Sequence, residues 1–280
     1  VWEMSFTDSI CIGCSRGCNI KIGVRNNEIL RLNPRENSDV NQYWMCDFGR
    51  LDTFKFINDF ELRISTPKIK LDEPFKSEEK QTSVGWDEAV SKTASLLNSH
   101  FSKIFFLASP IKTIEDNFAL KRFANEIGHT DNIYFIPHIN EKFGDDILRK
   151  PDMTPNSAGL RYLGFKEINA ELIRKIKQEK DYLLFTLNDP LNFIDDEEEF
   201  ASVFPVSIQL FSLKNKFTHL ADVLFPISTY AEVNGTFMNF QNRIQRIRPA
   251  ITTLEEERLL GEHELSRLDK FGAPNDRWTH

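Results

Sequence analysis

Three of the four cysteines in the chain lie within the single stretch CIGCSRGCNI. Cys11, Cys14 and Cys18 follow the spacing C-x2-C-x3-C, and Cys46 comes much later, in WMCDFGR. Four thiols can form two disulfides, bind a metal or stay free. Structural zinc sites usually contain two C-x2-C pairs, whereas three crowded thiols and one distant thiol suit a cubane with one cysteine per iron. The spacing therefore favours a [4Fe-4S] cluster over zinc, disulfides or free buried cysteines.

The residues around the cysteines agree with a bulky anionic group. Gly13 and Gly17 let the backbone pass close to an inorganic core, and their N–H groups are candidates to donate to its sulfides. Arg16 and Arg50 are candidates to offset the negative charge of four thiolates. We therefore expect both arginines to lie near the cluster.

A small β unit must bring Cys46 back to the other three cysteines. The stretches NIKIGV and ILRL alternate apolar and polar residues, and NNE between them is typical of a turn. A hairpin followed by a loop through Pro34 would return the chain to the cluster. We expect residues 1–60 to form a cluster-binding domain and residues 61–280 to form a second domain.

Beyond residue 60, strand and helix patterns alternate. This order indicates an α/β protein with a parallel sheet. The helix that begins in TIEDNFALKRFANEIG has a capping pair, Thr113 and Asp116, and a stop signal at Gly128. Residues 137–163 have weak periodicity and predict a linker or a reduced connection. The predicted helices are 84–99, 113–128 and 168–180, and the predicted strands are 103–109, 132–136, 181–187 and 206–212.

Composition excludes several classes of protein. The 280 residues carry a net charge of -7, which argues against nucleic acid as a partner. No apolar run is long enough to cross a membrane, so we expect no direct membrane insertion. The start, VWEMSFTDSI, lacks the pattern of a signal peptide and does not begin with Met. We expect an intracellular protein, and the sequence leaves open whether a further N-terminal part belongs to this chain or to a separate one.

Several motifs together resemble one family. CIGCSRGCNI, ILRLNPRENSDVNQYWMCDFGR, RISTPKIK, VGWDEAV and ADVLFPISTYAEVNGTFMNFQNRIQRIRPA are similar to the molybdopterin-oxidoreductase-like part of the large peripheral-arm subunits (G subunits) of NADH:quinone oxidoreductase, respiratory complex I. The resemblance covers most of residues 9–250 in the family's order. It implies a small β-rich 4Fe-4S domain followed by a reduced Rossmann-like α/β domain of the molybdopterin-oxidoreductase type.

The chain also departs from the pattern that the resemblance implies. Full members have a much longer middle that clasps the pterin cofactor, and catalytic members generally carry Lys or Arg two residues after the last cluster cysteine. This chain has Phe48 there, and no cysteine after Cys46 to bind molybdenum. We therefore expect one [4Fe-4S] cluster, no molybdopterin and no catalytic residues.

Other polar residues have both a structural and a functional interpretation. The resemblance places one set of residues near the pterin of active relatives, although turn chemistry is the favoured interpretation here: Glu232, Gly235, Thr236, Asn239 and Arg243. The acidic run at residues 195–199 is either a solvated helix start or a docking site. The tail at residues 254–270 is a candidate amphipathic helix. The histidines, which show no metal-binding spacing, are His100, His129, His138, His219, His263 and His280.

Two functions are compatible with these features. The favoured one, implied by the resemblance, is a non-catalytic iron-sulfur subunit of the complex I peripheral arm, with a mainly structural cluster. Its partners would be other peripheral-arm subunits, including ferredoxin-like cluster-bearing and NADH-binding subunits, at the cytoplasmic face of the inner membrane. The alternative is an electron-transfer or catalytic fragment of a molybdopterin enzyme, such as a formate dehydrogenase or a hydrogenase-linked complex.

Overall fold

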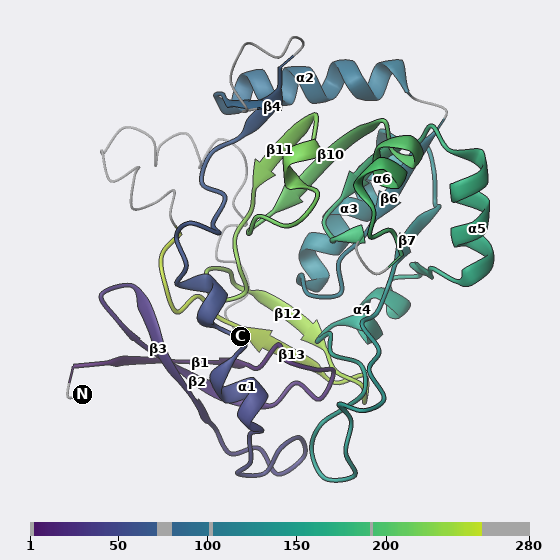
Figure 1. The fold of residues 1–280 in the computed structure, drawn as a ribbon. Coiled ribbons are helices and arrows are strands. Elements are labelled where there is room, and N and C mark those ends of the chain that lie inside the picture. The colour runs from purple at the N-terminus through teal and green to yellow at the C-terminus, as the bar shows by residue number, and fades with distance from the viewer. Residues whose placement is uncertain (1–2, 72–79, 101–102, 191–192, 254–280) are drawn as a thin grey trace.

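A computed structural model describes residues 3–71, 80–100, 103–190 and 193–253 of the chain. Two parts are visible in Figure 1: a small antiparallel sheet with the cysteine-bearing loops, and a larger sheet flanked by helices. This confirms the expected class, a small β-rich region followed by an α/β domain. The predicted boundary at residue 60 stays a prediction. The candidate helix at residues 254–270 lies outside the described residues.

The small sheet forms from adjacent stretches of sequence, in the order β1-β2-β3. The predicted hairpin is present, and Asn26 and Asn27 both adopt the left-handed conformation at its turn, with φ of 52° and 60°. Asparagine tolerates this conformation better than most residues, which explains the turn. A first strand, which the sequence pattern did not predict, pairs with the hairpin. The strands are β1 (Ser5–Ile10), β2 (Asn19–Arg25) and β3 (Glu28–Pro34).

The large sheet has the strand order β5-β4-β11-β10-β9-β6-β7-β8. The six strands from β11 to β8 are parallel to one another, and β4 and β5 join antiparallel at one edge. The strands are β4 (Lys68–Lys70), β5 (Gln81–Ser83), β6 (Ile104–Leu107), β7 (Ile133–Phe135), β8 (Lys166–Glu167), β9 (Leu183–Thr186), β10 (Val206–Phe211) and β11 (Val223–Pro226).

Helices cover both faces of this sheet. Successive residues of a strand point to opposite faces. Accordingly, Phe106 of β6 belongs to the core under α2 and α3, whereas Phe105 and Leu107 belong to the core under α5 and α6. The expected Thr113–Asp116 capping box begins α3. The helices of this part are α2 (Trp86–Ser99), α3 (Ile114–Glu126), α4 (Ser157–Tyr162), α5 (Ala170–Glu179), α6 (Glu197–Val203) and the 3-10 helix η3 (Thr218–Leu220).

The connection over residues 137–163 is short, as expected, but it is not a plain linker. It contains α4, and residues 138–153 form a loop whose two ends are joined by an isolated β-bridge between Ile139 and Asp152. The acidic run is the exposed start of α6, where Asp196 caps the helix by accepting from the Glu199 N–H. The run is thus an exposed helix start, as predicted, and the choice between a solvated start and a docking site stays a prediction.

A second hairpin packs against the cysteine-bearing region although it is about 200 residues away in sequence. It consists of β12 (Gly235–Met238) and β13 (Ile244–Ile247), which pair antiparallel. One core contains Ile10, Cys11 and Cys18 together with Phe237 and Ile247. Two short helices, α1 (Asp47–Leu51) and the 3-10 helix η1 (Lys55–Ile57), complete this region. The cysteines therefore lie in a core that both ends of the described chain build.

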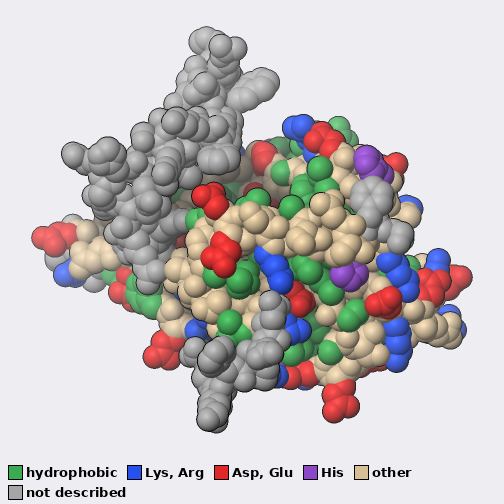
Figure 2. All heavy atoms as spheres, turned by 90° about the horizontal axis from the view of Figure 1, so that it is seen from above, with side chains coloured by type: hydrophobic (Ala, Val, Ile, Leu, Met, Phe, Trp, Pro, Cys, Tyr) green, Lys and Arg blue, Asp and Glu red, His purple; other side chains and the backbone are tan. Residues whose placement is uncertain are grey.

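No single kind of charge dominates the face of the molecule that Figure 2 shows. On that face, acidic, basic and hydrophobic side chains are interspersed. Among the described residues, no helix combines the length and the apolar character needed to cross a bilayer.

Candidate iron-sulfur centre

Two loops and a helix start position the four cysteines. Cys11 follows β1 and Cys18 precedes β2, and the Cys11 N–H donates to the Cys18 carbonyl oxygen at 2.8 Å, which closes the loop that carries Cys14. Cys46 is the N-cap of α1. All four thiols are free of disulfides, and those of the first three residues are buried. The fold thus brings the distant Cys46 to the same region as the tight loop.

The four sulfur atoms lie close enough to influence one another's charge. Burial raises the pKa of the Cys11 thiol well above its usual range, and negative charge on Cys18, Cys14 and Cys46 raises it further. Burial and the charges of Cys14 and Cys46 likewise raise the pKa of Cys18 to about 12. Four neighbouring thiolates are therefore unfavourable without a compensating positive charge, such as iron supplies.

Gly49 brings the backbone close to two of the sulfurs. A Cβ atom added at Gly49 would lie 2.9 Å from Cys11 Sγ and 3.5 Å from Cys46 Sγ. The sequence pattern pointed to Gly13 and Gly17 but not to this glycine, although it stands three residues after Cys46. A position where only glycine fits, beside the buried thiol of Cys11 and the half-buried thiol of Cys46, agrees with a bulky inorganic core.

Backbone N–H groups point at the sulfurs, as cluster binding requires. Gly13 donates to Cys11 Sγ and Gly49 donates to Cys46 Sγ, each at 3.4 Å. Burial raises the pKa of Cys14, and hydrogen bonds from the N–H groups of Lys150 and Arg16 partly offset this rise. Gly13 thus donates to a cysteine sulfur, and the expected donation to cluster sulfides stays a prediction. Gly17 instead turns the chain, with φ of 65°, and donates to the Cys14 carbonyl oxygen.

The two arginines have different positions. The charge of Arg16 lowers the pKa values of Cys14 and Cys18, as expected for a residue that offsets thiolate charge. Its guanidinium donates to the Ile147 carbonyl oxygen at 2.9 Å. Arg50 lies in the last turn of α1, where a positive charge complements the helix dipole.

The described residues contain no group of three or more His, Cys, Asp or Glu side chains that could hold a single metal ion. A single zinc ion draws four sulfurs to about 2.3 Å from one point. A cubane spreads its four thiolates over four irons, so the sulfurs stand farther apart. His263 and His280 lie outside the described residues.

The residues that the resemblance placed near a pterin make contacts within the protein. Glu232 is buried and accepts two hydrogen bonds from Arg63, at 2.6 and 2.8 Å. Thr236 donates to Glu115, and the Asn239 side chain accepts from the Arg243 N–H at 3.0 Å. A Cβ at Gly235 would meet Thr113, and Arg243 pairs with Asp39 at 2.8 Å. These contacts agree with the favoured interpretation, turn and packing chemistry, and the choice between it and cofactor binding stays a prediction.

A cavity of about 570 Å³ lies at the carboxyl ends of the parallel strands. Its wall includes Leu187, Leu210 and Pro226, which end or follow β9, β10 and β11, and Lys112 before α3. The Lys112 ammonium donates to Ser212 Oγ at 2.9 Å and to the Ser228 carbonyl oxygen at 2.6 Å. Burial lowers its pKa to about 8. No sequence signal pointed to Lys112, because only the folded sheet shows that it is half-buried.

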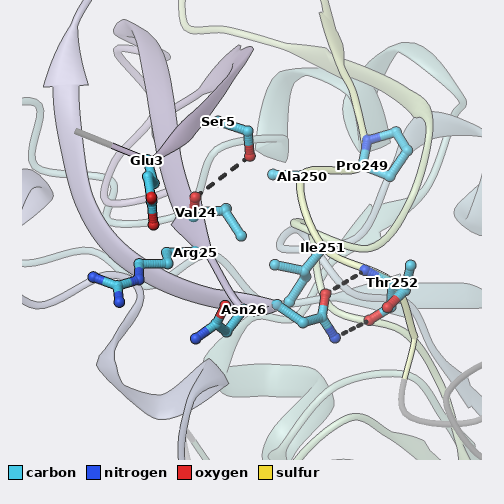
Figure 3. A pocket seen from close by; sticks show the side chains of 10 residues that line it. Glu3, Ser5, Val24, Arg25, Asn26, Pro249, Ala250, Ile251 and Thr252 are labelled. Atoms are coloured by element: carbon cyan, nitrogen blue, oxygen red, sulfur yellow. Dashed lines mark hydrogen bonds between the residues drawn. The ribbon is translucent and has the colours of Figure 1, made fainter. Parts of the chain in front are cut away.

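A second pocket, of about 510 Å³, lies at the open end of the small sheet (Figure 3). Its lining includes no cysteine. Asn27 exchanges two hydrogen bonds with the backbone of Thr252, and Ser5 donates to the Val24 carbonyl oxygen at 3.4 Å. The side chains of Asn27 and Ser5 are thus engaged with backbone groups of the same lining.

Comparisons with known protein families match two separate segments of the chain, one in the cysteine-bearing region and one in the α/β part. The family described as "Molybdopterin oxidoreductase Fe4S4 domain" matches residues 4–51, and the family "Molybdopterin oxidoreductase" matches residues 152–259. The first match includes all four cysteines and supports an iron-sulfur cluster in this region.

Several curated relatives share one name. The G subunit of NADH-quinone oxidoreductase from Pseudomonas fluorescens is 38% identical over 120 residues, which is 43% of this chain and 12% of the relative. The G subunits of Escherichia coli K12 and Salmonella typhimurium LT2 are each 33% identical, over 45% and 48% of this chain and 13% of their own length. The matched stretches span only about an eighth of these relatives. The chain therefore resembles the molybdopterin oxidoreductases in both of its parts and, in its sequence, a shortened G subunit of NADH-quinone oxidoreductase.

Proposed function

We propose that the chain binds one [4Fe-4S] cluster through Cys11, Cys14, Cys18 and Cys46. The observation that carries this proposal is the convergence of four free thiols from two separate segments around a glycine whose Cβ would approach two of the sulfurs. The raised pKa values of Cys11 and Cys18 supply the reason that a cationic core is needed. When bound, such a cluster would accept and release one electron.

We further propose that this chain is an accessory, non-catalytic subunit in the peripheral arm of an NADH:quinone oxidoreductase. The similarity to the G subunits supports this assignment. Its partners would be the other peripheral-arm subunits, including those that bind NADH and ferredoxin-like clusters, at the cytoplasmic face of the inner membrane. No molybdopterin is expected, because the chain has Phe48 in place of the basic residue expected from catalytic members of the superfamily and has only a short connection at residues 137–163.

The proposed role of the cluster is mainly structural. The cysteine-bearing loop and Cys46 belong to a small region, and a cluster that joins them supplies a cross-link that limited packing cannot. In the Cys14→Ala variant, assembly with partner subunits should weaken. Complexes that still assemble should oxidise NADH at a near-normal rate. Normal assembly with collapsed turnover would mean that the cluster carries the main electron flow, against this proposal.

One observation favours the alternative, a fragment of a molybdopterin enzyme. The cavity beside Lys112 lies outside the carboxyl ends of the parallel strands, where α/β proteins generally bind ligands. Extraction of purified protein followed by a fluorescence assay for oxidised pterin separates the two functions. An empty extract supports the accessory role, and a stoichiometric yield of pterin supports the alternative.

A further inference from the structure

Residues 138–153 form a loop that is closed at its base and braced inside. The Met153 N–H donates to the His138 carbonyl oxygen, and the Asn140 N–H donates to the Pro151 carbonyl oxygen, both at 2.8 Å. Within the loop, Asp145 pairs with Arg149 at 2.8 Å. A loop of this length with adjoining ends is an Ω-loop, a compact form that holds its own shape. We call it the closed loop.

The closed loop contacts the cysteine-bearing loop directly. The Ser15 N–H donates to the Asp152 carbonyl oxygen at 2.8 Å, and the Arg16 side chain donates to the Ile147 carbonyl oxygen. The Lys150 N–H is a hydrogen-bond donor to the thiol of Cys14. Leu148 packs against the core that contains Cys11 and Cys18. Several residues of the closed loop therefore contact the cysteine-bearing region, and one of these contacts is with Cys14, a candidate ligand of the cluster.

An aromatic stack extends from the cysteines into the closed loop. A Cβ at Gly13 would lie 3.2 Å from the ring of Phe48, which belongs to the helix that Cys46 caps. The ring of Phe48 meets that of Phe143 edge to face, with centroids 5.1 Å apart. The guanidinium of Arg149 then lies over the Phe143 ring at 5.2 Å. The rings of Phe48 and Phe143 thus follow one another from the cysteine-bearing loop, and the guanidinium of Arg149 lies beyond them.

Arg149 also interacts electrostatically with the cysteines. Its hydrogen bond to Asp145 is the main reason that the pKa of Arg149 is raised, and negative charge on Cys46 and Cys14 raises it further. Positive charge near a cluster favours its reduced, more negative state, and exposure to water has the same effect. The aromatic stack and Arg149 would therefore act on the reduction potential in opposite directions.

We propose that the closed loop is the cover of the iron-sulfur centre, in which Phe143 keeps water away from the cluster and Arg149 raises its reduction potential. This inference rests on the proposed function, because it needs the four cysteines to bind a cluster. It gives roles beside the cluster to Phe143 and Arg149. Both residues belong to the short connection at residues 137–163, where full members of the superfamily have a much longer segment.

The test uses the full chain, purified anaerobically, in five variants. Phe143→Ala opens the cover and Phe143→Leu keeps an apolar side chain there. Arg149→Gln removes the charge and Arg149→Lys keeps it. The matched control is Arg122→Gln, because Arg122 forms a similar exposed pair with Glu126 at 2.9 Å on α3. Two quantities are measured: the midpoint potential in an anaerobic redox titration, and the rate at which a water-soluble chelator extracts iron.

The proposal expects opposite shifts. Phe143→Ala should release iron severalfold faster and have a higher potential, with Phe143→Leu close to the unmodified chain. Arg149→Gln should have a lower potential, which Arg149→Lys restores, and Arg122→Gln should change neither quantity. The loop has no role as a cover if the Phe143 and Arg149 variants match Arg122→Gln in both measurements. If Phe143→Ala does not fold, the potentials and iron-release rates of Phe143→Leu, Arg149→Gln and Arg149→Lys still decide whether the loop acts on the cluster. An unmodified chain without iron would instead overturn the proposed function itself.

Discussion

Gly49 shows how one atom can decide whether a cluster fits. In the Gly49→Ala variant, the new Cβ would lie 2.9 Å from Cys11 Sγ, closer than real Cβ contacts allow. We expect this variant to fold but to retain much less iron after anaerobic purification. Gly85→Ala is the matched control, because a Cβ there meets no atom within 4 Å. Equal iron in the two variants would show that Gly49 does not border the cluster.

Lys112 gives a prediction for the dependence of stability on pH. Burial lowers its pKa in the folded protein to about 8, below the ordinary value of 10.5. Between these two pH values the unfolded chain binds more protons, so the free energy of unfolding gains a contribution that rises with pH. The rise amounts to about 3 kcal/mol at most.

Urea unfolding of the unmodified chain and of Lys112→Met across this pH range measures that contribution. The buried thiols titrate in the same range with the opposite sign, but they are present in both proteins and cancel in the comparison. The stability difference between the two proteins should change steadily from pH 8 to 10.5. A constant difference would contradict a lowered pKa at Lys112.

The buried ion pair between Arg63 and Glu232 joins two connecting segments of the chain. Arg63 precedes β4 and Glu232 precedes β12, and both side chains are almost completely buried, at 4% and 1% exposure. Removing one partner of such a pair leaves a buried charge without compensation. We expect Glu232→Gln to lower the free energy of unfolding by about 3 kcal/mol.

An exposed pair provides the control for this prediction. Arg122 and Glu126 lie one turn apart on α3, with both side chains more than half exposed. Glu126→Gln should cost less than about 0.5 kcal/mol. Chemical denaturation of both variants gives the comparison, and equal costs would mean that the buried pair contributes no more than a surface pair.

Elements with local signals were predictable from the sequence. The hairpin of β2 and β3 depends on alternating residues and on two asparagines that suit its turn, and α3 depends on its own capping box. The cysteines of the candidate site were also predictable, because their spacing is itself the signal. Local patterns determine these features, so no distant contact is needed to find them.

Elements that depend on distant contacts were not predictable. The hairpin of β12 and β13 joins the core of Cys11 and Cys18 across more than 200 residues. The closed loop has weak periodicity, because its shape comes from Asp145 and from bonds between its ends. Gly49, Lys112 and Arg149 acquire their roles only from neighbours that the fold brings to them.

The chain as a whole contains cores that should respond differently to loss of the cluster. The core around Cys11 and Cys18 includes residues of β12 and β13, whereas the cores of the large sheet consist of other residues. In Cys14→Ala, amide hydrogen exchange should therefore accelerate in β2, β3, β12 and β13. Protection in β6, β9 and β10 should stay near that of the unmodified chain, because these strands have their own packing.

The comparison for this exchange experiment is the unmodified chain after its iron has been removed with a chelator. It should show the same pattern as Cys14→Ala, because both lack the cross-link. Uniform loss of protection in both parts would mean that the chain unfolds as a single unit. Unchanged exchange everywhere would mean that the cluster does not stabilise its region.

The central claim is that the four cysteines hold a [4Fe-4S] cluster, and metal analysis of the anaerobically purified chain tests it most directly. Iron, acid-labile sulfide and zinc are measured on the same sample, together with the spectrum before and after reduction. A cubane requires about four irons and about four sulfides per chain, with a signal that reduction changes. About one zinc per chain, with neither iron nor sulfide, would contradict the claim.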